Sequence, residues 1–272
     1  MIKALVLGGG GAKGFAHVGV IRALEEKGFV PDLIIGVSAG ALVGAGYALL
    51  SDSKRLWEIS LEICRKGKKL LRFANSAARE NRGLLFNAAT CFHINTFKAL
   101  PFGLYLNALK KGLKGYRFSD TRIPFKCVST IMDSGELFVH EEGSIFEALR
   151  ASMAIPGIIS PFSHKGFSLA DGGIVNNIPV SIAKEEGCTL VLAVDLSSNN
   201  RKVGIDTSNS ILEIIDVYKV EEFQRKELAL ADVVISPLNK RNIGLLDFSS
   251  CIELMNESYE ETLKFDLIGA SQ

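Results

Sequence analysis

The sequence predicts an α/β fold with a mainly parallel central sheet flanked by helices. Short apolar runs alternate along the chain with longer segments in which apolar residues recur at helical spacing, and glycine-rich or polar turns separate them. Such alternation is typical of strand–helix–strand units, which build parallel sheets. With 272 residues, 47% of them hydrophobic, the chain is long enough to bury the core of a single domain, 1–272.

The elements are expected in a regular order. A strand at 3–7 leads through a glycine loop into a helix at 12–27, for which Gly28 is a C-cap. A strand at 33–37 and a helix at 39–51 form the next unit. Four further strands are expected at 124–131, 137–140, 190–195 and 233–235, with a hairpin turn at 133–136. Four further helices are expected at 144–150, 179–186, 210–230 and 249–264.

The most informative stretch is Gly36-Val37-Ser38-Ala39-Gly40, between the second expected strand and its helix. Because Gly36 and Gly40 lack side chains, the backbone can turn sharply and project the Ser38 hydroxyl from the carboxyl edge of the sheet. The helix N-terminus at this point favours a developing negative charge. Ser38 is therefore a candidate nucleophile, and the alternative is a tight turn with a capping serine.

A second motif, Gly8-Gly9-Gly10-Gly11-Ala12-Lys13-Gly14, joins the first strand to its helix. Gly9, Gly11 and Gly14 also fit the G-x-G-x-x-G fingerprint of dinucleotide-binding loops. That fingerprint needs an acidic residue near the end of the next strand, where this chain has Gly36-Val37-Ser38, so nucleotide binding is disfavoured. Beside a nucleophilic serine, the N–H groups of such a loop are expected to form an oxyanion hole.

A third motif, Leu169-Ala170-Asp171-Gly172-Gly173, places a carboxylate at the end of a short apolar run. By itself it predicts only a turn, because Asp-Gly is among the commonest turn dipeptides. In combination with the serine elbow, Asp171 supplies a base. The ordered set of glycine loop, serine and aspartate is much more specific than any one of the three motifs.

Together these motifs resemble those of the patatin-like phospholipases, serine acyl hydrolases that use a Ser-Asp dyad. The resemblance runs from residue 1 to about 195 and more weakly to Phe265. It assigns the catalytic pair to Ser38 and Asp171. It assigns the oxyanion hole to Gly9, Gly10 and Gly11, with motif support from Lys13, Gly14, Gly36, Gly40, Gly172 and Gly173. The segments 150–157 and 176–180 also look like their counterparts in bacterial members.

One position departs from the family pattern. Lys13 stands where the family usually has arginine, so the positive charge is kept while the planar fork of the guanidinium is lost. The resemblance otherwise implies a three-layer patatin-like sandwich and metal-independent, cofactor-free acyl transfer. Asp171 takes the proton of Ser38 as its Oγ attacks an ester carbonyl, and water later releases the fatty acid.

The expected substrates are fatty-acyl esters of phospholipids or lysophospholipids. An acyltransferase or a thioesterase would share the acyl-Ser38 intermediate and differ only in the second half-reaction. Outside the enzymes, the alternative is a module that binds a phosphate group or nucleotide through Gly9, Gly11 and Gly14, with Ser38 as a cap.

The histidines test the dyad interpretation, because a conventional triad needs a histidine base and the chain has four. His17 is expected to pack within the first helix. His93 and His140 lie beside apolar stretches without an orienting carboxylate. His164, in a loop seven residues before Asp171, is the rival base and is disfavoured because the resemblance gives that role to Asp171. No metal is expected, because no His or Cys cluster has metal-ligand spacing.

The net charge of +1 hides a strong asymmetry. Residues 54–117 carry fourteen Lys or Arg side chains against three carboxylates, a net charge of +11, which leaves −10 for the rest of the chain. The segment also contains aromatic and apolar clusters at 70–73 and 97–106. We expect a helical cap or lid insert here that contacts an anionic lipid surface, the alternative being a solvated basic face. Nucleic acid is not expected, because the remainder is acidic.

Cysteine usage and hydropathy predict a cytoplasmic protein with peripheral membrane contact. The five cysteines are scattered and form no C-x-x-C pair, the pattern of reduced thiols. The chain enters its first strand at once, which leaves no room for a signal peptide. No apolar run approaches the about 20 residues that span a bilayer.

Overall fold

The computed structural model describes residues 1–80, 106–197, 221–238, 243 and 248–265, and of 67–80 the backbone alone. Its centre is an eight-stranded sheet in the order β5-β6-β3-β2-β1-β7-β8, with β4 paired to β3 outside this path. The strands are β1 (Lys3–Leu7), β2 (Leu33–Val37), β3 (Phe125–Ile131), β4 (Leu137–His140), β5 (Phe162–His164), β6 (Phe167–Asp171), β7 (Leu190–Val194) and β8 (Val233–Ile235).

The sheet is parallel through its centre and antiparallel at one side. β1 runs parallel to β2 and β7, and the parallel order continues from β2 to β3 and from β7 to β8. The pairs β3–β4, β3–β6 and β5–β6 are antiparallel. The predicted mainly parallel α/β sheet is therefore confirmed. The hairpin of β5 and β6 was not expected, because its short strands fall in a segment that looked like a loop.

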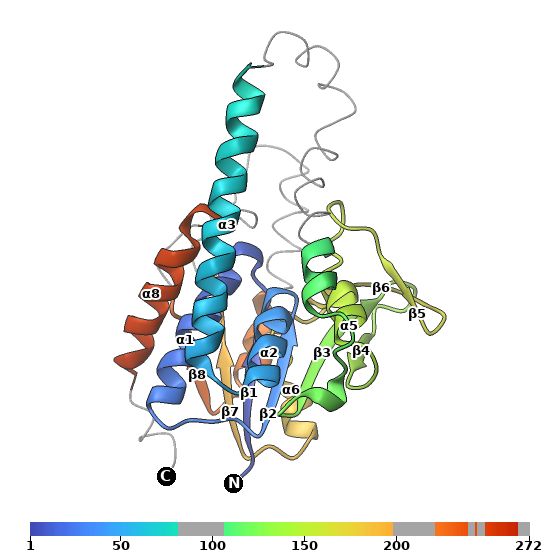
Figure 1. The fold of residues 1–272 in the computed structure, drawn as a ribbon. Coiled ribbons are helices and arrows are strands. Elements are labelled where there is room, and N and C mark those ends of the chain that lie inside the picture. Colours follow the sequence, from blue (N-terminus) through green and yellow to red (C-terminus); the bar gives the residue numbers. More distant parts are fainter. Residues whose placement is uncertain (81–105, 198–220, 239–242, 244–247, 266–272) are drawn as a thin grey trace, which may run out of the picture.

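Helices cover both faces of the sheet, which gives three layers (Figure 1). The helices are α1 (Phe15–Glu26), α2 (Ala39–Leu50), α3 (Ser53–Glu80), α5 (Ile145–Ser152), α6 (Val180–Glu185) and α8 (Cys251–Leu263), and residues 221–228 are also helical. Neighbouring residues of β1 point to opposite faces. Leu5 packs with the cluster of α1, α2 and α8, whereas Ala4 and Val6 pack with that of α6.

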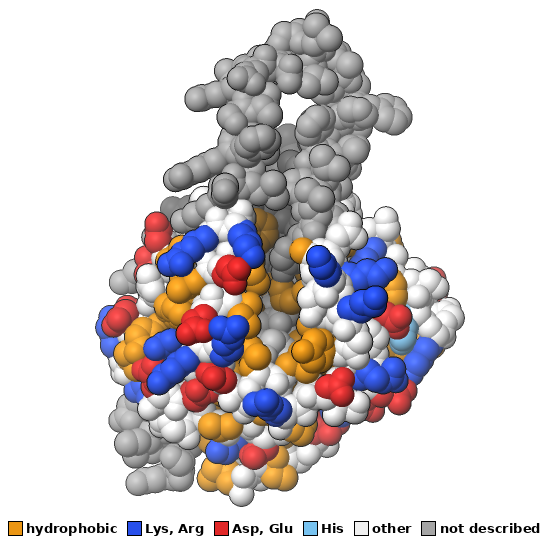
Figure 2. All heavy atoms as spheres, in the orientation of Figure 1, with side chains coloured by type: hydrophobic (Ala, Val, Ile, Leu, Met, Phe, Trp, Pro, Cys, Tyr) orange, Lys and Arg blue, Asp and Glu red, His pale blue; other side chains and the backbone are white. Residues whose placement is uncertain are grey.

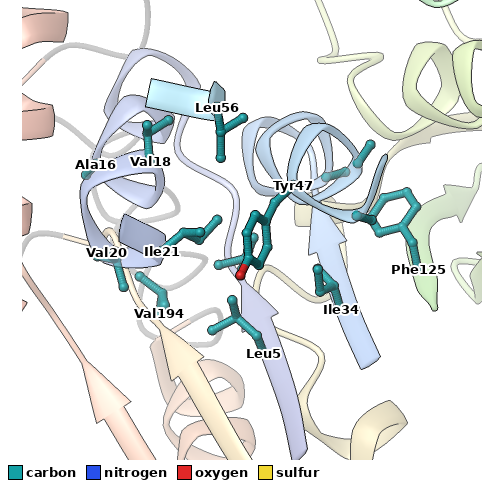
Figure 3. Packing of buried hydrophobic residues seen from close by; sticks show 14 of the residues in the cluster. Leu5, Ala16, Val18, Val20, Ile21, Ile34, Tyr47, Leu56, Phe125 and Val194 are labelled. Carbon is teal, nitrogen blue, oxygen red and sulfur yellow. The ribbon is translucent and has the colours of Figure 1, made fainter. Parts of the chain in front are cut away.

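The larger cluster forms the core between the sheet and the α1–α2 layer. Leu5, Ile34 and Val194 come from three adjacent strands and meet Ile21 of α1 (Figure 3). Tyr47 of α2 lies among them with 1% of its surface exposed. Its hydroxyl donates to the Glu25 carboxylate at 2.6 Å, so the one polar atom that it brings into the core is satisfied.

Helix α3 is much longer than the layer it belongs to. At 1.5 Å per residue its 28 residues extend about 42 Å, against about 18 Å for the twelve residues of α2. It begins beside the end of α2 and runs back past the start of that helix (Figure 1). Its far end therefore lies roughly 24 Å beyond the start of α2.

The C-terminal helix α8 lies directly against α1. A Cβ at Gly19 would lie 2.8 Å from Tyr259 N, so the two helices approach to backbone contact at this glycine. Ser258 Oγ donates to Ala16 O at 2.8 Å, which fixes the register between them. The strong resemblance ended before this element, and the structure makes α8 part of the same core.

The strands and helices expected outside the insert are present, with boundaries shifted by at most three residues. Residues 210–220 of the expected helix 210–230 lie outside the described part of the chain, and so does His93. Cys64, Cys127, Cys188 and Cys251 are buried free thiols, and Cys91 lies outside the described part. Within the described chain, we find no helix with the length and apolar character required to cross a bilayer.

Candidate active site

Ser38 occupies a sharp turn between β2 and α2, as the glycine pattern predicted. Its backbone has φ 52° and ψ −117°, a strained conformation for a residue with a side chain. A Cβ at Gly36 would lie 2.6 Å from Ala41 N, and a Cβ at Gly40 would lie 2.6 Å from Gly8 O. The two glycines are therefore required by the close approach of the backbone around the serine.

Asp171 meets Ser38 because the carboxyl ends of β2 and β6 converge on β3. In the sheet register Val37 is opposite Val128, and Asp171 is opposite the next residue, Ser129. The Ser38 hydroxyl, which follows Val37 in the chain, lies near enough to the Asp171 carboxylate to favour its ionised form. The two side chains are 6% and 7% exposed, so this contact is almost closed to bulk water.

The environment of Asp171 favours proton uptake. Burial raises the pKa of its carboxyl above the ordinary value, while hydrogen bonds from Ser38 and from the Gly173 N–H oppose the rise. The Gly173 N–H donates to Oδ1 at 2.8 Å. A carboxylate whose pKa is raised by desolvation is a stronger base than an exposed aspartate. The backbone turns here against β3, because a Cβ at Gly172 would lie 2.6 Å from Val128 O.

The segment at the end of α5 fixes both residues from one side. Ser152 Oγ accepts a hydrogen bond from the Ser38 N–H at 2.9 Å, and Ala154 O accepts one from the Asp171 N–H at 3.0 Å. Ser152 is fully buried. Sequence reasoning gave Ser152 no role, because a contact across 114 residues leaves no signal in the local pattern.

The glycine loop lies against the serine, and one of its three expected donors is already used. A Cβ at Gly9 would lie 3.5 Å from Ser38 Cβ. The Gly9 N–H donates to Asn177 O at 3.2 Å, which corrects its expected role as a free donor. Gly10 and Gly11 begin the short helix η1 (Gly11–Gly14), and the first N–H groups of a helix have no partner within it. Gly10 and Gly11 therefore remain the candidate N–H donors of this loop.

Lys13 and Gly14 attach this loop to its neighbours. Lys13 Nζ donates to Leu196 O, just beyond β7, at 3.3 Å. A Cβ at Gly14 would lie 2.5 Å from Ala39 Cβ, so the loop rests on the first residue of α2. The bond from Lys13 to a backbone carbonyl needs only one N–H donor, so the ammonium of lysine can make it as well as the guanidinium of arginine.

The contacts of the described histidines are with groups other than the Ser38 hydroxyl and the Asp171 carboxylate. His17 is fully buried, and its Nε2 lies 2.7 Å from Gly8 O, so Nε2 carries the proton and donates it. Burial lowers the pKa of His17 to about 4. His140 is buried against Ser129. The rival base His164 lies on β5 with Nδ1 3.9 Å from the Glu147 carboxylate.

Among the described side chains, the Asp171 carboxylate is therefore the candidate base beside Ser38. Among the described residues, no group of three or more His, Cys, Asp or Glu side chains could hold a metal ion. The described site brings together a buried hydroxyl, a buried carboxylate and the N–H groups of a glycine loop.

A family model described as patatin-like phospholipase matches residues 5–184, a range that includes the glycine loop, the serine elbow and the Asp171 turn. The chain belongs to the patatin-like phospholipases. The match begins in β1 and ends within α6, so it takes in every strand but β7 and β8. Helix α8 lies beyond the matched range and packs against α1.

Curated relatives are similar over most of this patatin-like chain. Lysophospholipase NTE1 of Kluyveromyces lactis is 32% identical over 207 residues, or 76% of this chain. Human patatin-like phospholipase domain-containing protein 6 is 31% identical over 199 residues, or 72% of this chain. The matched region covers only 13% of the length of each of these relatives.

A solved structure supports the patatin-like fold. VipD from Legionella pneumophila superposes with a TM-score of 0.54 at 18% sequence identity, covering 96% of this chain and 66% of VipD. The likeness therefore extends past the family model to the C-terminal part of the chain.

Proposed function

We propose that the protein is a serine acyl hydrolase that cleaves fatty-acyl esters of lysophospholipids or phospholipids. The observation that carries the proposal is the juxtaposition of the buried Ser38 hydroxyl and the buried Asp171 carboxylate at two strand ends that adjoin β3. Family membership supports lipid ester chemistry, and relatives named lysophospholipase support an acyl ester of a lysophospholipid as substrate. The strained turn at Ser38 supports a nucleophile, because backbone strain of this kind clusters at active sites.

In the first half-reaction, Ser38 Oγ attacks the ester carbonyl carbon while Asp171 accepts the hydroxyl proton. The carbonyl π electrons move to the oxygen and form an oxyanion. The carbon–oxygen bond to the glycerol backbone then breaks, and the leaving alkoxide takes the proton held by Asp171. The products are the released alcohol and an acyl-Ser38 ester.

The N–H groups of Gly10 and Gly11 are the proposed oxyanion donors. They follow Gly9, which lies against the Ser38 side chain, and they open η1, where the helix end favours negative charge. Each such donor contributes about 3–4 kcal/mol to stabilising the transition state. The second half-reaction repeats the sequence with water, whose proton passes to Asp171 and then to Ser38 as the fatty acid leaves.

We further propose that residues 54–117 form a cap that meets an anionic lipid surface. The described part of the cap includes the projecting helix α3 and the exposed Lys110, Lys111 and Lys114. These three lysines form no ion pair with any residue that the structure describes. Figure 2 shows hydrophobic side chains along the middle of one face of the molecule, with basic and acidic side chains on both sides. Apolar side chains next to exposed lysines suit a surface of acidic headgroups.

The experiment that tests the activity is fatty-acid release from lysophosphatidylcholine micelles in the presence of EDTA. The wild-type protein is expected to release one fatty acid for each water consumed, and Ser38→Ala to release none. Adding an alcohol acceptor separates hydrolysis from acyl transfer, because transfer would produce a new ester at the expense of free fatty acid. Absence of fatty-acid release from every lysophospholipid and phospholipid offered would contradict the proposal.

A further inference from the structure

Asn177 lies between the two halves of the candidate site. We propose that it is a positioning residue, which holds the glycine loop at a fixed distance from the Asp171 turn. This inference rests on the proposed function, because it assigns Asn177 to the alignment of the oxyanion donors with the nucleophile and the base.

On one side, Asn177 binds both polar backbone groups of Gly9. Its backbone carbonyl accepts a hydrogen bond from the Gly9 N–H at 3.2 Å, and its side-chain Nδ2 donates to Gly9 O at 3.3 Å. Gly8 is held as well, with its N–H on Val194 O at 3.1 Å and its carbonyl on His17 Nε2 at 2.7 Å. Since four backbone groups before Gly10 are satisfied, the orientation of the following N–H groups is determined by these bonds.

On the other side, the Asn177 amide lies at the Asp171 turn. A Cβ at Gly173 would lie 2.8 Å from Asn177 Oδ1 and 3.1 Å from Asp171 Oδ1. These two oxygens therefore lie at most about 6 Å apart, within the range over which one charge shifts the pKa of another. The preceding residue, Asn176, donates its N–H to Gly172 O at 3.0 Å, so this turn and Asn177 are joined through the backbone too.

Asn177 is itself held in place by its neighbours along the chain. Asn176 is 2% exposed, and its Oδ1 accepts the Ile178 N–H at 3.0 Å. Ile178 is fully buried and packs against Gly8, where a Cβ would lie 2.8 Å from Ile178 Cγ1. A side chain anchored on both flanks is suited to fix the spacing of the two loops that it contacts.

The test compares Asn177→Ala and Asn177→Asp with Thr121→Ala, which removes a similar side-chain bond to a carbonyl far from the site in the chain. Kinetics use a soluble short-chain p-nitrophenyl ester, with active sites counted by fluorophosphonate titration. We expect Asn177→Ala to lower kcat per active site by about 10- to 100-fold with KM changed less than about threefold. Amide hydrogen exchange at Gly9, whose N–H is bonded to Asn177 O, should accelerate in this variant and not in Thr121→Ala.

Asn177→Asp tests the closeness of this side chain to Asp171 through the pH profile. A carboxylate there cannot donate to Gly9 O and places a second negative charge near Asp171, so the acidic limb of the kcat/KM profile should move to higher pH. An active wild type with an equally active Asn177→Ala variant would overturn this inference alone. A wild type without ester hydrolysis would overturn the proposed function, and with it the positioning role of Asn177.

Discussion

The backbone N–H of Ser38 donates a hydrogen bond to Oγ of Ser152, 114 residues later in the chain, at 2.9 Å. Ser152 is fully buried at the end of α5. Its Oγ holds the backbone of Ser38, which is strained at φ 52°. Two residues further on, Ala154 O holds the Asp171 N–H. One short segment therefore supports the proposed nucleophile and the proposed base.

Ser152→Ala is expected to destabilise the protein and slow catalysis together. The change leaves the Ser38 N–H buried without its acceptor, which costs about 1–3 kcal/mol of unfolding free energy. Turnover per folded molecule should fall by at least about tenfold, because the elbow is free to relax. Urea unfolding and ester hydrolysis measure the two effects, with the exposed Ser163→Ala as the matched control. Normal turnover in a destabilised Ser152→Ala protein would show that the bond serves folding only.

The pH dependence of kcat/KM should report the titration of Asp171. As the base it must be ionised, so kcat/KM falls as pH decreases through a pKa that burial raises above the ordinary value for aspartate. Asp171→Asn should lower turnover by about 10²- to 10⁴-fold. A full rate with asparagine at this position would rule out Asp171 as the base.

The same variant should be at least as stable as the wild type at neutral pH. Because the folded-state pKa lies above the unfolded one, the folded protein binds more protons between the two values, and wild-type stability decreases as pH rises through that window. The asparagine side chain has no titrating proton, so the stability of Asp171→Asn should not decrease as pH rises through this window. Thermal unfolding of both proteins from about pH 3.5 to about pH 7 measures it.

His17 should make the protein sensitive to acid. The unfolded chain takes up a proton at His17 near pH 6.5, whereas the folded protein resists protonation down to about pH 4. Stability is therefore lost as pH falls through this window, by up to about 3 kcal/mol from this group. His17→Gln keeps a donor for Gly8 O without a titrating ring, so its unfolding free energy should vary less with pH. If the unfolding free energies of the wild type and His17→Gln varied identically with pH, His17 would not be the source of the acid sensitivity.

The lysines that follow α3 in the cap should govern binding to acidic membranes. Replacing Lys110, Lys111 and Lys114 by glutamine removes about 1 kcal/mol of attraction per charge. Co-sedimentation with anionic vesicles should fall at least about tenfold, and wild-type binding should weaken as salt shortens the screening length. The control replaces Lys3, Lys27 and Lys264, at the opposite edge of the sheet. Equal loss in both triple variants would mean that total charge, not the cap, attracts the membrane.

The elements that could be predicted from the sequence are those encoded in local patterns. The elbow at Ser38 could be predicted from two glycines between an apolar strand and a helix. The glycine loop after β1 could be predicted from the same kind of pattern. The hairpin of β5 and β6 could not be predicted, because Phe162–His164 is too short for a clear alternation. The extra length of α3 was also not predicted, since only a helical cap was expected there.

The contacts that define the candidate site are mostly long-range. Ser152 meets Ser38 and Asn177 meets Gly9 only because the sheet brings distant strand ends together. Glycine patterns in the loop indicated N–H donors but not that Asn177 already binds the Gly9 N–H, because hydrogen-bond partners depend on tertiary packing.

The most direct test of Ser38 as the nucleophile is covalent labelling with a fluorophosphonate followed by peptide mass spectrometry. A single adduct is expected on Ser38, formed in proportion to the loss of ester hydrolysis. Ser38→Ala should take up no label, and Asp171→Asn should label far more slowly than the wild type. An adduct on a different serine that tracks the loss of activity, or full hydrolysis by Ser38→Ala, would contradict this role of Ser38.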